Sequence, residues 1–310
     1  THRMKKTSIF FKSLQIVLLI ISIIFIERFC HQKTGGFQIS KIESDHPFNP
    51  EWETPDPSEE EAENIRNILD QKYTFFSYGG QAYVFLSEDG KSVLKLFKQH
   101  HLRVPAWIKS FPLPKTFKRI RNKWVHRKEG KFDLFFNSCK IAFDDFRDHT
   151  GLIYLHLNPT DYLKQQITIV DKLGIEHRID LDHTDFALQQ RAKLPKSHFH
   201  RLKKRNDYES AKRSLDSLID MIVARSQRGI ADRDPNIRRN CGFVGEKAVE
   251  IDLGSYTRSE TLKIPFICKA DIYQKSQQLK RMISKAYPEL SSYLDQRLNE
   301  ILYHTEFPTN

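Results

Sequence analysis

Residues 229–244 read GIADRDPNIRRNCGFV, a loop rich in Asp and Arg that leads into a short apolar run. Asp234 and Asn240 stand six positions apart in it, and the apolar run begins directly after Asn240. Such a loop is either a helix-to-strand turn with solvated charges or a place where a carboxylate and an amide serve one site. Because the strand begins at Asn240, we favour the second interpretation.

A second acidic turn follows closely. Residues 249–254 read VEIDLG, so that Asp252 ends an apolar strand and precedes Gly254. Asp252 lies twelve residues after Asn240, a spacing that suits one hairpin made of strands over 241–244 and 248–251. A carboxylate in this position can bind a metal ion that bridges phosphates.

Hydrophobic periodicity predicts the elements around these loops. They are a helix over Phe132–Arg147, strands over 167–173, 178–181 and 186–190, a helix over Tyr208–Arg228, and a helical tail from about Asp271. Strands and helices therefore occur together, and the fold class is α+β.

A glycine pair and a strand lysine stand upstream. Gly79 and Gly80 precede a strand at 84–86, which the turn Glu88-Asp89-Gly90-Lys91 joins to a strand at 92–97. Lys95 lies within the second strand. If that strand is buried, its ammonium needs an anionic partner; otherwise Lys95 lies on an exposed strand face.

The order of these segments resembles the protein-kinase-like fold over roughly residues 73–256. The resemblance implies a small antiparallel-sheet N-lobe, a short helical C-lobe, and the cofactors ATP and Mg²⁺. It makes Asp234 and Lys95 the catalytic residues and Asn240 and Asp252 the metal ligands. The residues that it assigns to nucleotide binding are Gly79, Gly80, Ala82, Lys95 and Gln190.

This chain departs from the family pattern in several places. Ala82 replaces the last loop glycine, Asp232 replaces the His of His-Arg-Asp, and the step to Asn240 is six residues instead of five. The expected helix Glu is missing, and only Asp133, Asp144, Asp145 and, upstream, Glu129 are available. About 55 residues follow Gly254, without an Ala-Pro-Glu motif.

The resemblance also sets the expected organisation. Residues 58–188 form the N-lobe, with a basic insertion at 99–131, and 189–310 form the C-lobe. Residues 189–192, Gln-Gln-Arg-Ala, are the expected hinge, whose backbone pairs with adenine. Residues 31–57 contain four prolines and are the expected linker, and Ser58 is the expected N-cap of a helix.

The amino-terminal segment has the composition of a membrane anchor. An apolar run over 9–26 follows Arg3, Lys5 and Lys6, with Lys12 inside it, and no small-x-small cleavage site comes after it. We expect an uncleaved single-pass anchor over 1–30, in the inner membrane if the source is bacterial; a buried core helix is the alternative. The positive-inside rule places the amino terminus in the cytoplasm, which conflicts with a need for ATP on the other side.

The segment 115–131 is dense in Lys and Arg, with Phe117 and Trp124 between the cations. It fits an anionic membrane surface, a nucleic acid that stacks on the aromatic rings, or a simple solvated face.

Composition limits the classes that remain. The chain has 310 residues, a formal net charge of +11 and four Cys without C-x-x-C spacing, which excludes a disulfide scaffold and signals no zinc site. Its 22 Phe and 11 Tyr exclude a disordered chain. Three hypotheses remain: a membrane-tethered phosphotransferase, a catalytically inactive kinase-like binding module, and a basic protein that binds a membrane surface or nucleic acid.

Overall fold

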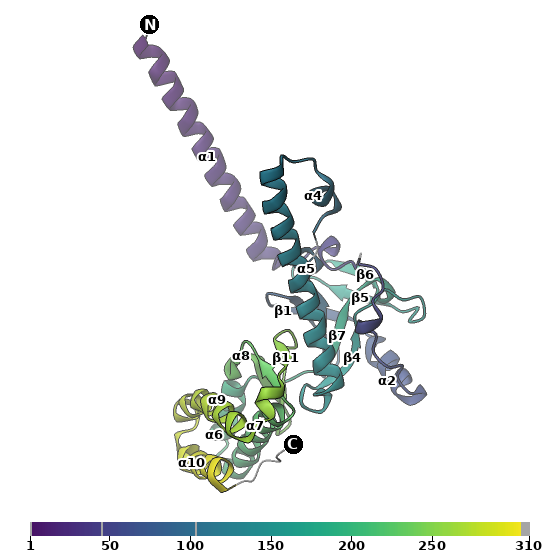
Figure 1. The fold of residues 1–310 in the computed structure, drawn as a ribbon, viewed down its shortest axis with the longest axis vertical. Helices are drawn as coiled ribbons and strands as arrows, with labels where there is room; N and C mark the ends of the chain where they lie inside the picture. Colours follow the sequence, from purple (N-terminus) through teal and green to yellow (C-terminus); the bar gives the residue numbers. More distant parts are fainter. Residues whose placement is uncertain (1, 45, 103, 305–310) are drawn as a thin grey trace.

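The computed structural model describes residues 2–44, 46–102 and 104–304, apart from the side chains of residues 2–13, 101, 102 and 106. The fold is mixed α+β. A curled sheet of seven strands forms one region, a mostly helical region lies beside it, and helix α1 (His2–Thr34) projects away from both (Figure 1).

The sheet has the order β4-β7-β3-β2-β1-β5-β6. The pairs are antiparallel apart from β1 and β5, which are parallel. The strands are β1 (Tyr73–Tyr78), β2 (Ala82–Ser87), β3 (Ser92–Phe97), β4 (Leu152–His156), β5 (Gln166–Val170), β6 (Glu176–Asp180) and β7 (Phe186–Gln190). The strands at 84–86, 92–97 and 186–190 are confirmed. The predicted ends near 173 and 181 are wrong because tight turns after Val170 and Asp180 stop the ladder, and β1 and β4 were not predicted.

Helix α5 (Lys115–Asp144) corrects the sequence interpretation most. We expected a helix only from Phe132, with a basic insertion over 99–131. The structure instead has one helix of 30 residues, preceded by the short helices α3 (Gln99–Leu102) and α4 (Ala106–Ser110). Lys and Arg are good helix formers, and the single Gly130 costs only about 1 kcal/mol inside a helix. The basic segment is therefore the first half of α5.

The helical region contains the predicted helix as α7 (Tyr208–Gln227). The tail begins earlier than expected, at α9 (Pro265–Ala286), because Pro265 is suited to the first turn of a helix. The other elements of this region are α6 (Pro195–Lys204), β8 (Ile230–Asp232), α8 (Ile237–Asn240), β9 (Cys241–Val244), β10 (Lys247–Glu250), β11 (Tyr256–Arg258) and α10 (Ser291–Asn299). The β9–β10 hairpin confirms the strands predicted around Val244.

Residues 31–57, expected to be a linker, pack against the rest of the chain. Phe37 and Ile42 are buried in the sheet core, and Trp52 stacks on Phe136 of α5 at 4.8 Å between ring centroids. The proline-rich composition suggested a loose arm, but its large apolar side chains remove it from solvent. Helix α2 (Glu59–Leu69) then begins at the predicted N-cap Ser58, whose hydroxyl and the Glu61 carboxylate form a capping box.

The last turn of α1 is attached to the sheet. The buried Tyr83 hydroxyl donates to the Gly36 carbonyl at 2.5 Å, and Lys172 Nζ donates to the Gln32 carbonyl at 2.7 Å. Residues 14–34 form a helix long and apolar enough to cross a membrane, and its described side chains are exposed as far as Lys33. A signal sequence near the amino terminus would have the same length and apolar composition. The side chains of residues 9–13 of the expected anchor lie outside the described residues.

The chain passes from the sheet to the helical region through residues 191–194, which lie against β9. Lys193 and Phe243 exchange backbone hydrogen bonds of 2.9 and 2.8 Å. A Cβ on Gly242 would lie 2.6 Å from the Cβ of Ala192, so Gly242 allows this close approach.

Replacing Gly242 by Ala therefore overpacks the contact with the Ala192 side chain and the Lys193 carbonyl. We expect G242A to cost about 1–3 kcal/mol of unfolding free energy, measured by chemical denaturation, and the additional change A192G to restore some of that loss. Gly80→Ala is the control because a Cβ there meets nothing within 4 Å. Equal stability of G242A and wild type would contradict the packing argument.

Candidate functional site

One pocket of about 1100 Å³ lies where the sheet meets the loops of the helical region. It is lined by β1–β3, by the connection after β7 and by the loops on either side of the β9–β10 hairpin. The eight residues predicted from the sequence all line it: Gly79, Gly80, Ala82, Lys95, Gln190, Asp234, Asn240 and Asp252. The structure therefore brings Lys95 and Asp252 to one pocket across a separation of 157 positions (252 − 95).

Lys95 reaches the pocket from the centre of the sheet. It lies on β3 between Val84 of β2 and Ala187 of β7, and its Nζ donates to the carbonyl of Ile251. Burial lowers the pKa of Lys95 to about 8, although the carboxylate of Asp252 opposes the shift. The sequence left open whether Lys95 is exposed; its low accessibility and these partners show that it points into the pocket.

Among the described residues, no acidic side chain of α5 or of its C-cap Asp145 pairs with Lys95. Asp144 binds Lys140 at 2.6 Å, Asp145 binds Arg258 at 2.7 Å, and Glu129 binds Lys109 at 2.8 Å. Asp133 is exposed, and partial burial raises its pKa. The α5 residue near Lys95 and Asp252 is the buried Cys139, where burial raises the pKa of the thiol. A neutral thiol thus stands where the resemblance asks for a carboxylate.

Ser138, the neighbour of Cys139, holds α5 against the Asp252 turn. Its buried hydroxyl donates to the Leu253 carbonyl and accepts from the Tyr256 N–H, both at 2.6 Å. A helix serine with two buried backbone partners gives no sequence signal, since both partners lie more than 100 residues away. These two hydrogen bonds fix the position of the Asp252 turn against α5.

Lys98 binds the backbone of the glycine loop, residues 79–81. Lys98 Nζ donates to the Gly79 carbonyl at 2.6 Å, its N–H donates to the Gln81 carbonyl at 2.8 Å, and its ammonium lies over the Tyr83 ring. Any Cβ at Gly79 or Gly80 would meet open space. The end of the Gln81 side chain reaches across the pocket to Gly254, where an added Cβ would clash with Gln81 Oε1.

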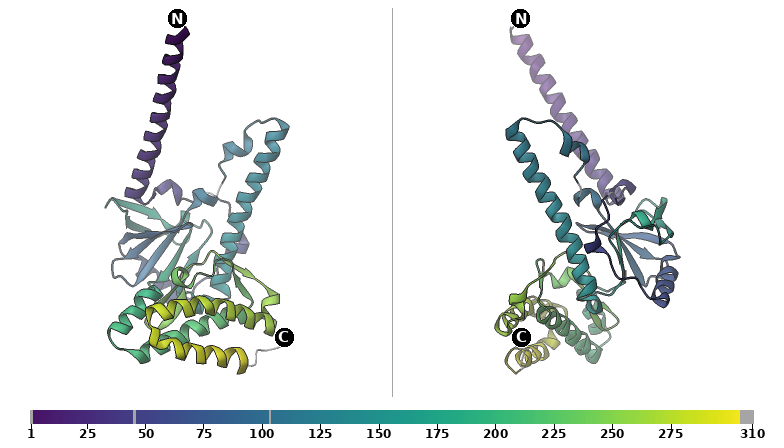
Figure 2. Two further views of the ribbon diagram at one scale, coloured as in Figure 1. Left: turned by 90° about the vertical axis from the view of Figure 1, so that its left-hand side faces the viewer. Right: turned by 45° about the vertical axis from the view of Figure 1, so that its right-hand side comes forward.

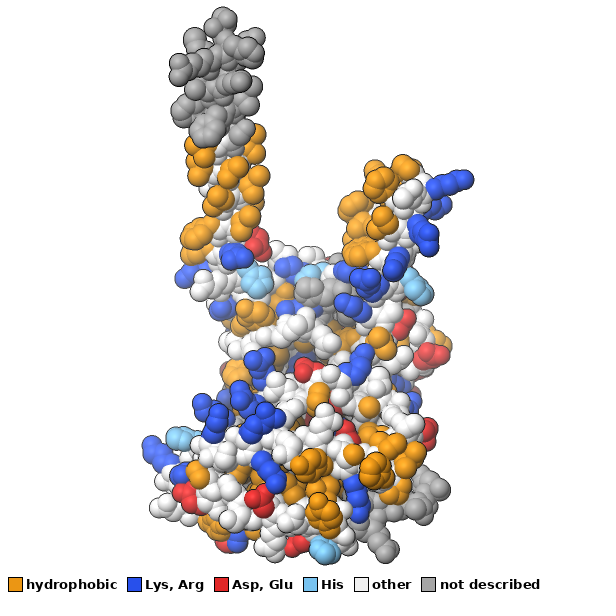
Figure 3. All heavy atoms as spheres, turned by 60° about the vertical axis from the view of Figure 1, so that its left-hand side comes forward, with side chains coloured by type: hydrophobic (Ala, Val, Ile, Leu, Met, Phe, Trp, Pro, Cys, Tyr) orange, Lys and Arg blue, Asp and Glu red, His pale blue; other side chains and the backbone are white. Residues whose placement is uncertain are grey.

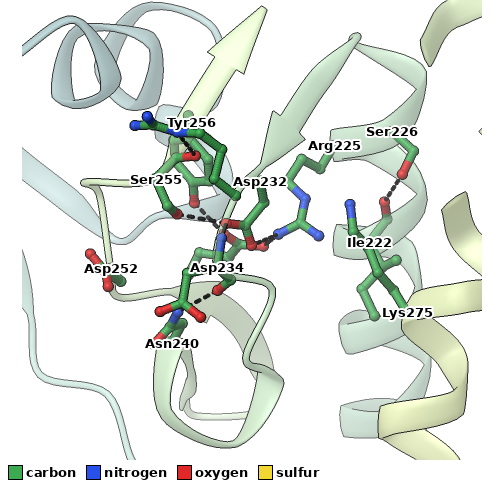
Figure 4. A network of polar contacts seen from close by, with 12 residues as sticks. Ile222, Arg225, Ser226, Asp232, Asp234, Asn240, Asp252, Ser255, Tyr256 and Lys275 are labelled. Atoms are coloured by element: carbon green, nitrogen blue, oxygen red, sulfur yellow. Dashed lines mark hydrogen bonds and ion pairs between the residues drawn. The ribbon is translucent and has the colours of Figure 1, made fainter. Parts of the chain in front are cut away.

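Asp234, Asn240 and Asp252 come together at the other wall (Figure 4). Asn240 Nδ2 donates to the Asp234 carbonyl at 2.7 Å, and the Asn240 carbonyl accepts from the Ile251 N–H at 2.7 Å. The Asp252 carboxylate accepts from the Gly254 N–H at 3.1 Å. Because the amide nitrogen of Asn240 is engaged, its side-chain oxygen remains for a cation. Asn240 and Asp252 thus have the oxygen donors that Mg²⁺ prefers.

A buried charge network lies behind Asp234. Asp232, which replaces the family His, accepts from the Asp234 N–H at 2.9 Å and from the Ser255 hydroxyl at 2.6 Å, and it pairs with Arg225 of α7 at 3.2 Å. Arg225 also pairs with Glu250, which accepts a hydrogen bond from the Tyr256 hydroxyl.

The roles of Arg225 and Glu250 in this network were missed from the sequence. Burial raises the pKa of Glu250, with Arg225 opposing it; burial likewise disfavours the charge of Arg225, but Glu250 and Asp232 outweigh it and raise its pKa. The sequence did contain a signal for this pair: Arg225 falls in the apolar stripe of α7, and Glu250 falls inside the apolar strand β10.

Residues 189–192 lie beside the glycine loop in the same pocket. The N–H groups of Gln190 and Arg191 donate to the carbonyls of Gly151 and Lys91, both at 2.8 Å. Within the described residues the Ala192 N–H has no backbone partner. The described stretches of the chain also contain no group of three His, Cys, Asp or Glu side chains that could hold a metal ion.

Comparison with known proteins identifies no family for this chain. No protein-family model matches the chain, and no curated protein matches it. One solved structure, described as the complex structure of Rv3197-erythromycin from Mycobacterium tuberculosis, is similar at 14% identity and a TM-score of 0.32, over 80% of this chain and 67% of that one. A likeness this low carries no argument about function.

The low pKa of Lys95 predicts a pH dependence. Below about pH 8 Lys95 is protonated in both folded and unfolded chains, and above it only the unfolded chain retains the proton up to its ordinary pKa of 10.5. Stability contributed by this group therefore rises from pH 8 to 10.5. We expect the stability of wild type relative to Lys95→Met, from denaturation at about pH 7.5 and about pH 9.5, to increase with pH. A constant difference would contradict the buried position of the ammonium.

Proposed function

We propose that this chain is a membrane-tethered phosphotransferase of the protein-kinase-like type, with two lobes around the pocket and with ATP and Mg²⁺ as cofactors. The observation that supports it most is that the eight residues assigned from the resemblance all line one pocket. These residues come from five stretches of the chain, around Gly79, Lys95, Gln190, Asp234 and Asp252, that lie far apart in the sequence.

Each residue then has a role that follows from its position. Lys95 and the open backbone of Gly79 and Gly80 bind phosphate oxygens, which add anionic partners for the buried ammonium to the Asp252 carboxylate. Ala192 pairs with the adenine edge through its backbone N–H. Asn240 and Asp252 hold Mg²⁺, which would neutralise charge on the phosphates.

Asp234 is the residue placed to receive the acceptor hydroxyl. Its side chain is exposed to the pocket, and its backbone is held on both sides, by Asp232 at the N–H and by Asn240 at the carbonyl. The carboxylate can therefore orient a hydroxyl and accept its proton without losing its own position. The acceptor in this proposal is a hydroxyl compound small or exposed enough to reach Asp234.

The second candidate is a catalytically inactive binding module of the same fold. It is favoured by the neutral Cys139 near Lys95, by the hydrogen bond from Lys95 to Ile251, and by the Gln81 side chain over Gly254. These contacts engage the Lys95 ammonium and bring a side chain against Gly254 within the chain itself.

Asp252→Ala tests the metal position. We expect wild type to gain stability with Mg²⁺ and ATP, by about 2.7 kcal/mol at 100 times the dissociation constant, and D252A to lose this Mg²⁺-dependent gain while it folds normally. Thermal melting of the full chain in detergent micelles measures it. Asp161→Ala, an exposed aspartate away from the pocket, is the control. A full Mg²⁺–ATP shift in D252A would contradict the assigned ligand.

Asp234→Ala separates binding from transfer. We expect D234A to bind Mg²⁺–ATP as wild type does but to release phosphate to water or to an acceptor at least about a hundredfold more slowly, because orientation and proton acceptance are lost. Radiolabelled ATP follows the release. If wild type shows neither a nucleotide-dependent shift nor any phosphate transfer, the enzyme proposal fails and the inactive module replaces it.

A further inference from the structure

The hairpin formed by α4, residues 111–114 and the first half of α5 stands away from the rest of the fold. It projects on the same side of the molecule as α1, and in both views of Figure 2 its free end is level with the middle of α1 rather than with its base. Arg121 closes the hairpin by donating to the Phe111 carbonyl at 2.6 Å. Two separate elements thus extend in the direction in which α1 would enter a bilayer.

The free end of the hairpin exposes large apolar side chains. Trp107 is 69% exposed, Phe111 55%, Phe117 59% and Ile120 63%. Phe117, Ile120 and Trp124 fall within about 60° of one another at about 100° per residue, so they form one face of α5. Clusters of exposed aromatic and aliphatic side chains of this kind mark contact surfaces rather than ordinary solvent-exposed positions.

The same hairpin is strongly basic. Residues 104–128 contain eight Lys or Arg and no Asp or Glu. Lys115, Lys118 and Arg119 lie on the face of α5 opposite Phe117 and Ile120. Figure 3 shows the two groups, with the apolar side chains on the side toward α1 and the cations on the outer side. Aromatic side chains on one face and cations on the other are typical of helices that lie at a membrane interface.

We propose that the α4–α5 hairpin is a second membrane contact, which inserts Trp107, Phe111, Phe117 and Ile120 among the lipids around α1 and places its cations against anionic headgroups. The proposal takes α1 as a retained membrane helix and does not depend on phosphotransfer. The attachment of α1 to the sheet through Gly36 and the packing of α5 beside the pocket then fix how the sheet and the helical region are oriented toward the membrane.

The charge and the position of the hairpin together select this partner. A nucleic acid would suit the cations and the two tryptophans, but it would not explain why the apolar end is level with an apolar helix. A basic residue near an anionic membrane strengthens binding roughly fivefold, so several act together.

Tryptophan quenching in the full chain tests the proposal. The chain has three Trp, and Trp52 is buried at 6% exposure, so W124F reports mainly on Trp107. We expect vesicles of phosphatidylcholine with a minority of phosphatidylglycerol and with brominated chains to quench W124F, and aqueous iodide not to do so. The double variant W107F/W124F, which retains only Trp52, gives the background.

Reversing the charges on the basic face of the hairpin is the second part of the test. Adding K115E, K118E and R119E to W124F should lower the ratio of inserted to free hairpin on the order of a hundredfold, so that lipid quenching falls to the background. The control reverses three exposed cations at α6, with K196E, K204E and R205E, and should leave quenching unchanged. All seven positions are exposed, so the variants keep the fold.

Three results would overturn the proposal. One is a Trp107 that lipid does not quench and iodide does in anionic vesicles, which places the hairpin in water. Another is protection of Trp107 from iodide by an RNA oligonucleotide and not by lipid, which makes the partner a nucleic acid. The last is protection that grows with the number of protein copies per vesicle, which makes the partner a second copy.

Discussion

The buried guanidinium of Arg225 between the carboxylates of Asp232 and Glu250 is the interaction on which the rest of the site depends. A buried charge is costly unless it is paired and hydrogen-bonded. Arg225 brings α7 together with β8 and β10, and the hydroxyls of Ser255 and Tyr256 bond the remaining carboxylate oxygens. Removing one member would leave its partners charged in a dry interior, so the elements that carry Asp234 and Asp252 cannot move independently.

Helix α5 connects the hairpin, the sheet and the pocket. Its first half belongs to the basic hairpin, its middle packs Phe132 and Phe136 against Trp52, and its last turns touch the Asp252 turn through Ser138. A helix of 30 residues is about 45 Å long at about 1.5 Å per residue, enough to extend from the pocket wall to the free hairpin end. The hairpin and the pocket wall are therefore parts of one continuous helix.

Much of the candidate site was predictable because its residues sit at the ends of strongly patterned segments. Lys95 stands inside an apolar strand, and Asp252 ends one just before a glycine. The supporting residues were not predictable to the same degree. Lys98 bonds Gly79, 19 positions away, Arg225 pairs with Glu250, 25 positions away, and Ser138 bonds Leu253, 115 positions away. No local pattern encodes such pairs. The start of α5 was missed for a related reason. The basic segment 115–131 has no apolar face toward the core, so its sequence indicated an insertion rather than a helix.

The sequence by itself determined the elements whose signal is local: the apolar amino-terminal helix, the Ser58 cap, the β2–β3 and β9–β10 hairpins, and α7 with its apolar stripe. Backbone propensity, side-chain periodicity and turn chemistry act over a few residues, so they can be read from the chain. Only the tertiary structure decided that Cys139 is the α5 residue near Lys95 and Asp252, that Asp232 pairs with a buried arginine, and that the basic hairpin projects on the same side as α1. These depend on which segments meet after the chain has closed on itself, where burial and electrostatics act between residues far apart in sequence.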